Sequence, residues 1–490
     1  MSEELEKLEI FSEKSVHSQD LEFFDQWTQY LRTWGVESRG VRPVPEDERT
    51  DRQIFKIFFI FFTSNFNILS FSSGTLGPVV FGLGLRDSCL CILFFELLCC
   101  APPAYFTIWG PKLGLRQMIA SRYSFGYYGI IIPCILNLIG MCGFCIINCI
   151  LGGQALSSVS DGHLSWTIGI VIIAVVSLLV SFCGIKVLVW YERVAWVPVV
   201  ITFLVALGVG GKHLSAPGPQ QPTSAASILS FASTIAGFSL TYSPLSSDFT
   251  NYFHPETSSW KTFLYSFLGF FLPTTALQIL GAAAAIASTD VESWGNGYQG
   301  GNVGGLLAAM LSPTGRFGKF LTVLLSLSVA GNIAPTFYSM SLNLQVFMPF
   351  LVVVPRYVFS IVATAVVIPI AIVGAHRFYV TLGNFLGIIG YWASAYISVF
   401  LIEHLVFRRN DFQNYDIHQW NKARLLPSGI AALGAATASF GLVIPCMAQA
   451  WYTGPIAKTT GDIGFEVAFA LSAVLYLPFR ALEIRIRGSL

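Results

Sequence analysis

Uncharged polar side chains lie in the middle of long apolar segments of this chain. Asn148 and Asn332 each fall within such a segment, and Asn332 is soon followed by Pro335 and Thr336. A carboxamide presents hydrogen-bond donors and an acceptor in one plane. This arrangement matches the edge of a planar, amide-like heterocycle, whose faces can stack on aromatic rings. These residue types therefore predict a binding site for a small planar ring.

Aromatic and hydroxyl side chains are placed where they could complete such a site. Phe144 lies four residues before Asn148, so the two share one face of a helix. Each candidate also has a purely structural interpretation, because amides and hydroxyls join helices through hydrogen bonds worth about 0.6 kcal/mol, while rings pack and proline bends a helix. The predicted substrate-binding residues are Ser70, Phe144, Asn148, Tyr242, Asn332, Pro335 and Thr336.

Three acidic residues are candidates for proton coupling. Glu96 lies deep within the run LFFELLCCAPP, and Asp248 and Glu192 lie near predicted cytoplasmic ends of spans. Ionisable groups inside a membrane are energetically costly and are functional candidates by default. For Glu192, neutralisation by the neighbouring Arg193 is an alternative to a role in a proton relay. No histidine lies in the middle of a predicted span.

Motifs typical of enzymes and metal sites are missing from the sequence. It contains no HExxH, GxSxG or GxxxxGK[ST] pattern. Its single CxxC pair, Cys142 and Cys145, has no second half and no nearby histidine. The ten cysteines lie in apolar runs, as expected of small buried residues. We therefore expect neither an enzyme nor a bound metal or cofactor.

The composition indicates an integral membrane protein. Of the 490 residues, 54% are hydrophobic and only 11% are charged, whereas soluble domains carry about 25% charged residues. So few charges could not cover the surface of a soluble fold of this length. The formal net charge of +1 gives no support for a nucleic-acid partner. The expected surroundings are a lipid bilayer.

An all-α protein with twelve transmembrane helices is predicted, since each crossing needs about 20 mostly apolar residues. Basic residues concentrate in the segments that place both termini in the cytoplasm. Residues 1–53 are predicted to form a cytoplasmic tail, 54–480 the transmembrane domain and 481–490 a second tail. The predicted spans lie near 55–83, 88–109, 126–155, 164–183, 187–209, 226–247, 260–288, 317–346, 355–374, 378–403, 425–446 and 462–480.

The first and sixth predicted spans differ from the others. They contain SFSSGTLGP (70–78) and GFSLTYSPLSSD (237–248), which gather Ser, Gly and Pro. The two spans are offset by five, as in transporters with a five-plus-five inverted repeat, where broken helices of both halves form the binding site. The repeats would span about 54–209 and 226–403, followed by two extra helices at about 425–480.

Several motifs resemble one known family. WGPKLGLRQMIASRYSFG (109–126) is similar to the signature loop of fungal purine–cytosine permeases, in the nucleobase–cation symport family. The resemblance covers about residues 39–480. It implies a LeuT-like fold of twelve spans and proton-coupled uptake of cytosine and purines across the plasma membrane. Further similar motifs, in the family's order, are RGVRPVPEDERTD, NCILGGQ, YERVAWVP, SDFTNY, GYWASAY and EHLVFR.

The resemblance also implies roles for individual residues. Gly331, Asn332 and Pro335 match the family's Gly-Asn-Asn-Ile-Pro-Asn pattern, whose amide binds the substrate. Asn148 matches its substrate-binding amide in the third span, and Glu192 an acid that affects transport. Ser70 matches a hydroxyl of the first span.

The sequence departs from the family pattern at five positions. Ile333 and Thr336 stand where asparagines are usual, and Phe144 and Tyr242 where tryptophan is frequent. Glu96 stands where an uncharged residue, often Asn, is expected. The pocket has therefore lost hydrogen-bonding groups and stacking surface, which can change discrimination by orders of magnitude.

These departures leave three hypotheses about function. The first is proton-coupled nucleobase uptake, with the substrate and protons as partners. The second keeps the fold but changes the ligand to vitamin B6 (pyridoxine) or another small cyclic vitamin. The third is a transport-inactive nucleobase receptor, for which a cytoplasmic signalling extension would be expected. Sodium stands as an alternative coupling ion, and the sequence predicts no particular oligomeric state.

Overall fold

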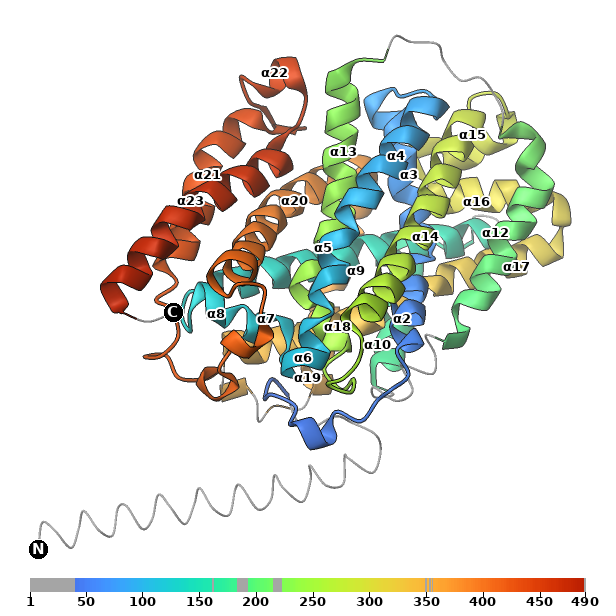
Figure 1. Ribbon diagram of the computed structural model, residues 1–490. Helices are drawn as coiled ribbons and strands as arrows, with labels where there is room; N and C mark the ends of the chain where they lie inside the picture. Colours follow the sequence, from blue (N-terminus) through green and yellow to red (C-terminus); the bar gives the residue numbers. More distant parts are fainter. Residues whose placement is uncertain are drawn as a thin grey trace, which may run out of the picture.

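The computed structural model describes residues 40–160, 163–182, 193–214, 223–348, 350–351, 354 and 356–488. In these ranges the chain is almost entirely helical, and its helices pack side by side in one body (Figure 1). A two-residue hairpin, β1 (Ala448–Gln449) and β2 (Tyr452–Thr453), is the only sheet among the described residues. The all-helical class predicted from the composition is therefore confirmed in the described part of the chain.

The helices differ widely in length, from single turns to 29 residues. The α-helices are α2 Phe55–Asn65, α3 Ile68–Phe81, α4 Leu85–Cys99, α5 Ala101–Phe106, α6 Trp109–Leu113, α7 Gln117–Ala120, α8 Arg122–Phe125, α9 Ile131–Val159, α10 Trp166–Phe182, α12 Trp196–Gly210, α13 Ala225–Leu240, α14 Ser259–Ala287, α15 Glu292–Tyr298, α16 Val303–Leu311, α17 Arg316–Ser328, α18 Ala330–Phe347, α19 Arg356–Gly374, α20 Phe378–Ile402, α21 Ile430–Cys446, α22 Ala457–Thr460 and α23 Gly464–Arg487. The 3₁₀ helices are η1 Glu46–Glu48, η2 Gly211–His213, η3 Ser243–Phe249, η4 Gln299–Gly301, η5 Ser312–Thr314, η7 Ala375–Arg377, η9 Phe412–Asn414 and η10 Ile417–Gln419, and η8 Glu403–Phe407 is a π-helix.

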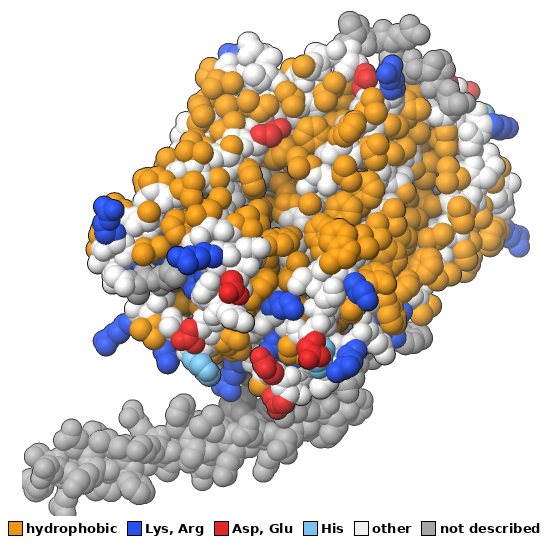
Figure 2. All heavy atoms as spheres, in the orientation of Figure 1, with side chains coloured by type: hydrophobic (Ala, Val, Ile, Leu, Met, Phe, Trp, Pro, Cys, Tyr) orange, Lys and Arg blue, Asp and Glu red, His pale blue; other side chains and the backbone are white. Residues whose placement is uncertain are grey.

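The outer surface of the helical body suits a lipid environment. On the face in Figure 2, hydrophobic side chains form a broad band, and charged side chains gather mainly toward its lower end. Among the described residues, eight helices are long and apolar enough to cross a membrane, or nine if one bent pair counts as a single span. A multi-pass membrane protein is the physical consequence, because such a surface is poorly solvated by water.

The expected spans can be compared with these helices individually. One continuous helical stretch, Val358–Phe407, covers both the ninth and the tenth expected span. Helices at the fourth and eleventh expected spans, Trp166–Ser181 and Ile430–Cys446, are apolar but shorter than 18 residues. The short helices α15 and α16, between the seventh and eighth expected spans, were not expected. The count of twelve crossings stays a prediction.

The first expected span is broken, as predicted, but at a different position. The chain bends by 55° between helices α2 and α3. The sequence indicated a break within SFSSGTLGP (70–78), yet this run lies inside α3, and the break falls at Phe66 and Asn67. The Asn67 side chain caps α3 by accepting hydrogen bonds from the backbone N–H groups of Leu69 and Ser70. This cap places the start of α3 before the run of Ser and Gly residues at 70–78.

The sixth expected span changes its helix type. Helix α13 ends at Leu240, and after a turn at Thr241 and Tyr242 the chain continues as the 3₁₀ helix η3. Pro244 lies in the first turn of η3, where its missing N–H leaves no partner unsatisfied. Tyr242 is therefore presented from an irregular part of the backbone.

Two chain ends depart from simple tails. Helix α23 extends to Arg487, beyond the expected end of the span at residue 480, and ends at Gly488, which has a left-handed φ of 71°. Pro478 lies within it without ending it. At the other end, the described residues from 40 onward pack on the helical body: Arg49 donates a 2.6 Å hydrogen bond to the carbonyl of Pro111.

Helices α3 and α14 approach each other closely through glycine. A Cβ atom on Gly281 of α14 would lie 1.9 Å from the carbonyl oxygen of Phe71, and one on Gly74 of α3 would lie 1.9 Å from the carbonyl oxygen of Gln278. Small residues allow backbones of membrane helices to pack in this way. The α3–α14 contact therefore depends on glycine at these two positions.

We expect Gly281→Ala to lower the midpoint of thermal unfolding of the purified protein in detergent, because the added methyl group overlaps backbone atoms and overpacking costs about 1–3 kcal/mol. Gly208→Ala is the matched control, since its Cβ meets nothing within 4 Å. Replacing glycine in a helix normally stabilises by about 0.5–1 kcal/mol. Equal midpoints for the two variants would contradict the close approach.

Candidate functional site

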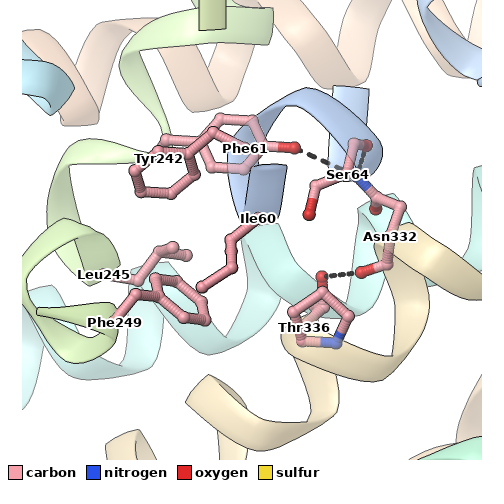
Figure 3. A pocket seen from close by; sticks show the side chains of 9 residues that line it. Ile60, Phe61, Ser64, Tyr242, Leu245, Phe249, Asn332 and Thr336 are labelled. Atoms are coloured by element: carbon pink, nitrogen blue, oxygen red, sulfur yellow. Dashed lines mark hydrogen bonds between the residues drawn. The ribbon is translucent and has the colours of Figure 1, made fainter. Parts of the chain in front are cut away.

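Asn332 of α18 joins three other parts of the chain through its amide. Its Nδ2 donates to the backbone carbonyl of Ser64 in α2 at 2.8 Å and to the Tyr242 hydroxyl at 3.0 Å. Its Oδ1 accepts a 2.9 Å hydrogen bond from Nδ2 of Asn148 in α9. Figure 3 shows the side chains of Ser64 and Asn332 side by side, with the Tyr242 hydroxyl pointing toward them. Both donors and the acceptor of this buried amide are therefore used within the protein.

Pro335 has a local structural role beside Asn332. Proline has no N–H, so the carbonyl of Gly331, four residues earlier, lacks its usual helical partner. The Ser64 hydroxyl lies 3.4 Å from this carbonyl oxygen and donates to it. Thr336 donates its hydroxyl to the Asn332 carbonyl at 2.6 Å. Pro335 thus leaves the carbonyl of Gly331 without its helical partner, and the hydroxyl of Ser64 in α2 donates a hydrogen bond to it instead.

Asn148 has an acceptor without a partner. Its Nδ2 donates to the Phe144 carbonyl at 2.9 Å and to Asn332. Its Oδ1 is buried and has no hydrogen-bond partner among the described residues. A buried, unpaired acceptor costs about 1–3 kcal/mol. A ligand with an N–H donor would relieve that cost.

A small cavity lies next to this amide pair, and we refer to it as the central cavity. Its volume is about 20 Å³, enough for roughly one water molecule. A heterocyclic ring does not fit into this volume, so ligand binding there requires the lining residues to move apart. The central cavity is lined by Ile60, Phe61, Ser64, Tyr242, Leu245, Phe249, Asn332, Pro335 and Thr336.

The predicted binding residues fall into two groups. Four of them line the central cavity: Tyr242, Asn332, Pro335 and Thr336. Asn148 does not line it but donates a hydrogen bond to Asn332, which does. Ser70 does not line it: its hydroxyl donates to the Asn65 carbonyl at 2.5 Å, across the break between α2 and α3. Phe144 does not line it either, and its ring packs edge-on against Phe385 with centroids 5.2 Å apart.

Sequence reasoning missed the α2 side of the cavity. Ile60, Phe61 and Ser64 line it from the helix before the break. Because we placed the break several residues too late, the side chains just ahead of it were read as part of an ordinary span. The signal that could have located them is Asn67, a strong N-cap residue inside an apolar run.

The three acidic candidates are not grouped in one place. Glu96 is fully buried between α4, α13 and α14, accepting hydrogen bonds from Ser239 and Gln278. Asp248, next to the cavity-lining Phe249, accepts a 3.0 Å hydrogen bond from the backbone N–H of Gln117. Glu192 lies outside the described residues. Within the described ranges, no group of three His, Cys, Asp or Glu side chains could hold a metal ion.

The sequence matches a family model described as permease for cytosine/purines, uracil, thiamine, allantoin, over residues 43–433. The chain belongs to this permease family. The family resemblance noted from the motifs is therefore confirmed, and the chain is a membrane transporter rather than an enzyme.

Individual relatives agree with this membership. Purine–cytosine permease fcyB of Emericella nidulans is 37% identical over 92% of this chain and 90% of its own length. Purine–cytosine permease FCY2 of Saccharomyces cerevisiae is 35% identical over 94% of this chain and 88% of its own length. The vitamin B6 transporter TPN1 of the same yeast is 30% identical over 92% of this chain and 88% of its own length.

Solved structures share the fold at low sequence identity. Mhp1, a nucleobase-cation-symport-1 family transporter in a closed conformation with bromovinylhydantoin bound, has a TM-score of 0.67 at 16% identity. The match covers 91% of this chain and 96% of that one. The inward-facing conformation of Mhp1 gives a TM-score of 0.65 at 15% identity, covering 91% of this chain and 93% of that one. At such identity these likenesses establish the fold alone.

Proposed function

We propose that this permease takes up nucleobases, namely cytosine and purines, together with protons across the plasma membrane. The observation that carries this proposal is the pair Asn148 and Asn332, two buried amides on facing helices, joined by a 2.9 Å hydrogen bond beside an aromatic-lined cavity. The similarity of this chain to fcyB, which is named a purine–cytosine permease, supports the substrate class.

Binding would proceed by exchange of hydrogen bonds. A base entering the widened cavity would take over the bond that Asn332 makes to Tyr242, and its N–H groups would pair with the free Oδ1 of Asn148. Tyr242 would then stack on the base. Phe144, which does not line the central cavity, would stack on the other face once the cavity widens. Pro335, Thr336 and Ser70 would shape the site.

We further propose the membrane layout predicted from the sequence. Twelve spans would form a five-plus-five inverted repeat (about 54–209 and 226–403) with two additional helices (about 425–480), as in LeuT-like transporters. Spans one, two, six and seven would rock against three, four, eight and nine. The preceding segment 1–53 and the end of the chain would both lie in the cytoplasm, consistent with the excess of basic residues there.

This topology predicts that epitope tags at either terminus are hidden in intact cells. Because the number of crossings is even and both ends are cytoplasmic, antibody should bind either tag only after the plasma membrane is permeabilised. Immunofluorescence with and without detergent measures this. Labelling of one tag in intact cells would mean an odd number of crossings.

Uptake of radiolabelled cytosine into cells lacking their own base permeases tests the function. We expect saturable uptake that is faster at about pH 5 than at about pH 7, since proton entry would drive accumulation. Excess adenine or hypoxanthine should compete. If the uptake rates are equal at both pH values and uptake depends on sodium, then sodium and not the proton is the coupling ion.

Two other results would redirect the assignment. If the protein reaches the cell surface but transports pyridoxine instead of cytosine, the altered pocket takes vitamin B6, as the name of TPN1 says for that relative. If cytosine binds without being transported, the protein is a receptor.

Asn332→Ala should reduce cytosine uptake by orders of magnitude, because a site built around hydrogen bonds discriminates strongly against the loss of one paired group. Asn343→Ala is the matched control: Asn343 is a buried amide on the same helix that does not line the central cavity. Surface labelling should show equal amounts of both variants. Unchanged uptake by Asn332→Ala would remove this residue from the site.

A further inference from the structure

The buried carboxylates of this protein differ in the kind of hydrogen-bond partner they have. Glu403, at the end of α20, is paired with the guanidinium groups of Arg408 and Arg480 at 3.1 and 2.9 Å. Asp462, in the connection before α23, accepts from the backbone N–H groups of Ala448 and Gly464 and also from the hydroxyls of Ser233 and Tyr391. Guanidinium groups only donate, so the two arginine partners of Glu403 cannot accept a hydrogen bond from a protonated carboxyl.

Glu96 has a different environment. Its side chain is fully buried and accepts hydrogen bonds from Ser239 Oγ at 2.5 Å, Gln278 Nε2 at 2.7 Å and Cys100 Sγ at 3.1 Å. None of these donors is basic. A carboxylate deep in a bilayer protein without a cationic partner carries a large desolvation cost.

Two of these partners can reverse the direction of their hydrogen bonds. A serine hydroxyl both donates and accepts, and the Gln278 amide carries a carbonyl oxygen beside its NH₂ group. That oxygen, Oε1, is buried and has no partner among the described residues. Turning the amide by half a rotation would bring Oε1 to face Glu96, where it could accept a hydrogen bond from a protonated carboxyl.

We propose that Glu96 is the group that binds the co-transported proton, with Gln278 and Ser239 satisfying both its ionised and its neutral form. This inference rests on the proposed function. The step balances simply: one proton from the external water forms the O–H bond of Glu96, no other covalent bond changes, and the same proton is released to the cytoplasm.

The position of Glu96 connects it to the candidate site. Ser239 lies on α13 three residues before Tyr242, whose hydroxyl accepts from Asn332. Gln278 lies on α14 where its backbone carbonyl faces Gly74 of α3. Protonation would therefore change the hydrogen bonds that join α4 to α13 and α14, next to both interrupted spans.

The other groups around Glu96 are two thiols, a hydroxyl and one further acid, none of them cationic. On its own helix and directly after it lie the thiols Cys99 and Cys100, and α14 also presents the hydroxyl of Thr274. From α23, Glu466 approaches Cys99. Among the described residues, no lysine, arginine or histidine is hydrogen-bonded or ion-paired with Glu96. Its charge is therefore set by solvent access and by its reversible partners.

Glu96→Gln tests the proposal. The amide imitates the neutral acid, so uptake of cytosine at about pH 5 and about pH 7 should become equal, a rate ratio of about 1, and accumulation against a gradient should be lost. Exchange of internal unlabelled for external labelled cytosine should persist, because it needs no net proton movement. A merely structural role would lower both activities at both pH values.

Glu466→Gln is the matched control, since it makes the same chemical change at a partly buried acid of α23. It should keep the pH dependence of the unmodified protein. If Glu96→Gln does not reach the cell surface, Glu96→Asp replaces it: the shorter carboxyl still titrates, and the pH profile of uptake should shift along the pH axis. An unchanged profile in the variant at the surface would overturn the proposal.

The two proposals fail in distinguishable ways. Absence of cytosine uptake by the unmodified protein at either pH would contradict the proposed function. If uptake depends on pH in the unmodified protein and keeps the same dependence in Glu96→Gln, only the role of Glu96 is contradicted. That result would point to another acid, such as Asp248.

Discussion

The fold depends on the requirement that the backbone polar groups inside a bilayer find their partners within the protein. Asn332 meets this requirement by bonding to α2, to α9 and to the turn after α13. Two of these places, the end of α2 and the turn after α13, are interruptions of a helix. Helix α9 is joined to them through Asn332. The broken backbone at Phe66 and Asn67 is likewise satisfied locally, by the cap that starts α3. One side-chain amide thus holds the irregular region together.

This arrangement has a consequence for ligand binding. In the proposed site, a substrate cannot simply be added to Asn332, because the donors and the acceptor of this amide are already used, so binding would exchange internal bonds for external ones. The unpaired Oδ1 of Asn148 would make the exchange favourable for a ligand that supplies an N–H group. A ligand lacking it leaves that acceptor unsatisfied, which is how such sites discriminate.

The acids show how tertiary surroundings divide residues of one type. Glu96 and Glu403 are both buried and lie in or at the end of apolar helices. Glu403 is paired with the guanidinium groups of Arg480 and Arg408, whereas the partners of Glu96 are a hydroxyl, a thiol and an amide. Position along the sequence marked Glu96 as unusual. Only the packing of α13 and α14 on α4 revealed that its neighbours can reverse their hydrogen bonds.

The sequence by itself determined the membrane class, the family and the positions of many apolar helices, and it singled out the amides Asn148 and Asn332, because hydropathy and motifs are local properties of the chain. It could not locate Ser64 or the break at Asn67, nor exclude Ser70 from the lining of the cavity. Those depend on which side chains from distant segments share one space and on where a cap ends a helix. Hydrogen bonds between residues far apart in sequence, such as Asn332 to Tyr242, exist only once the helices pack.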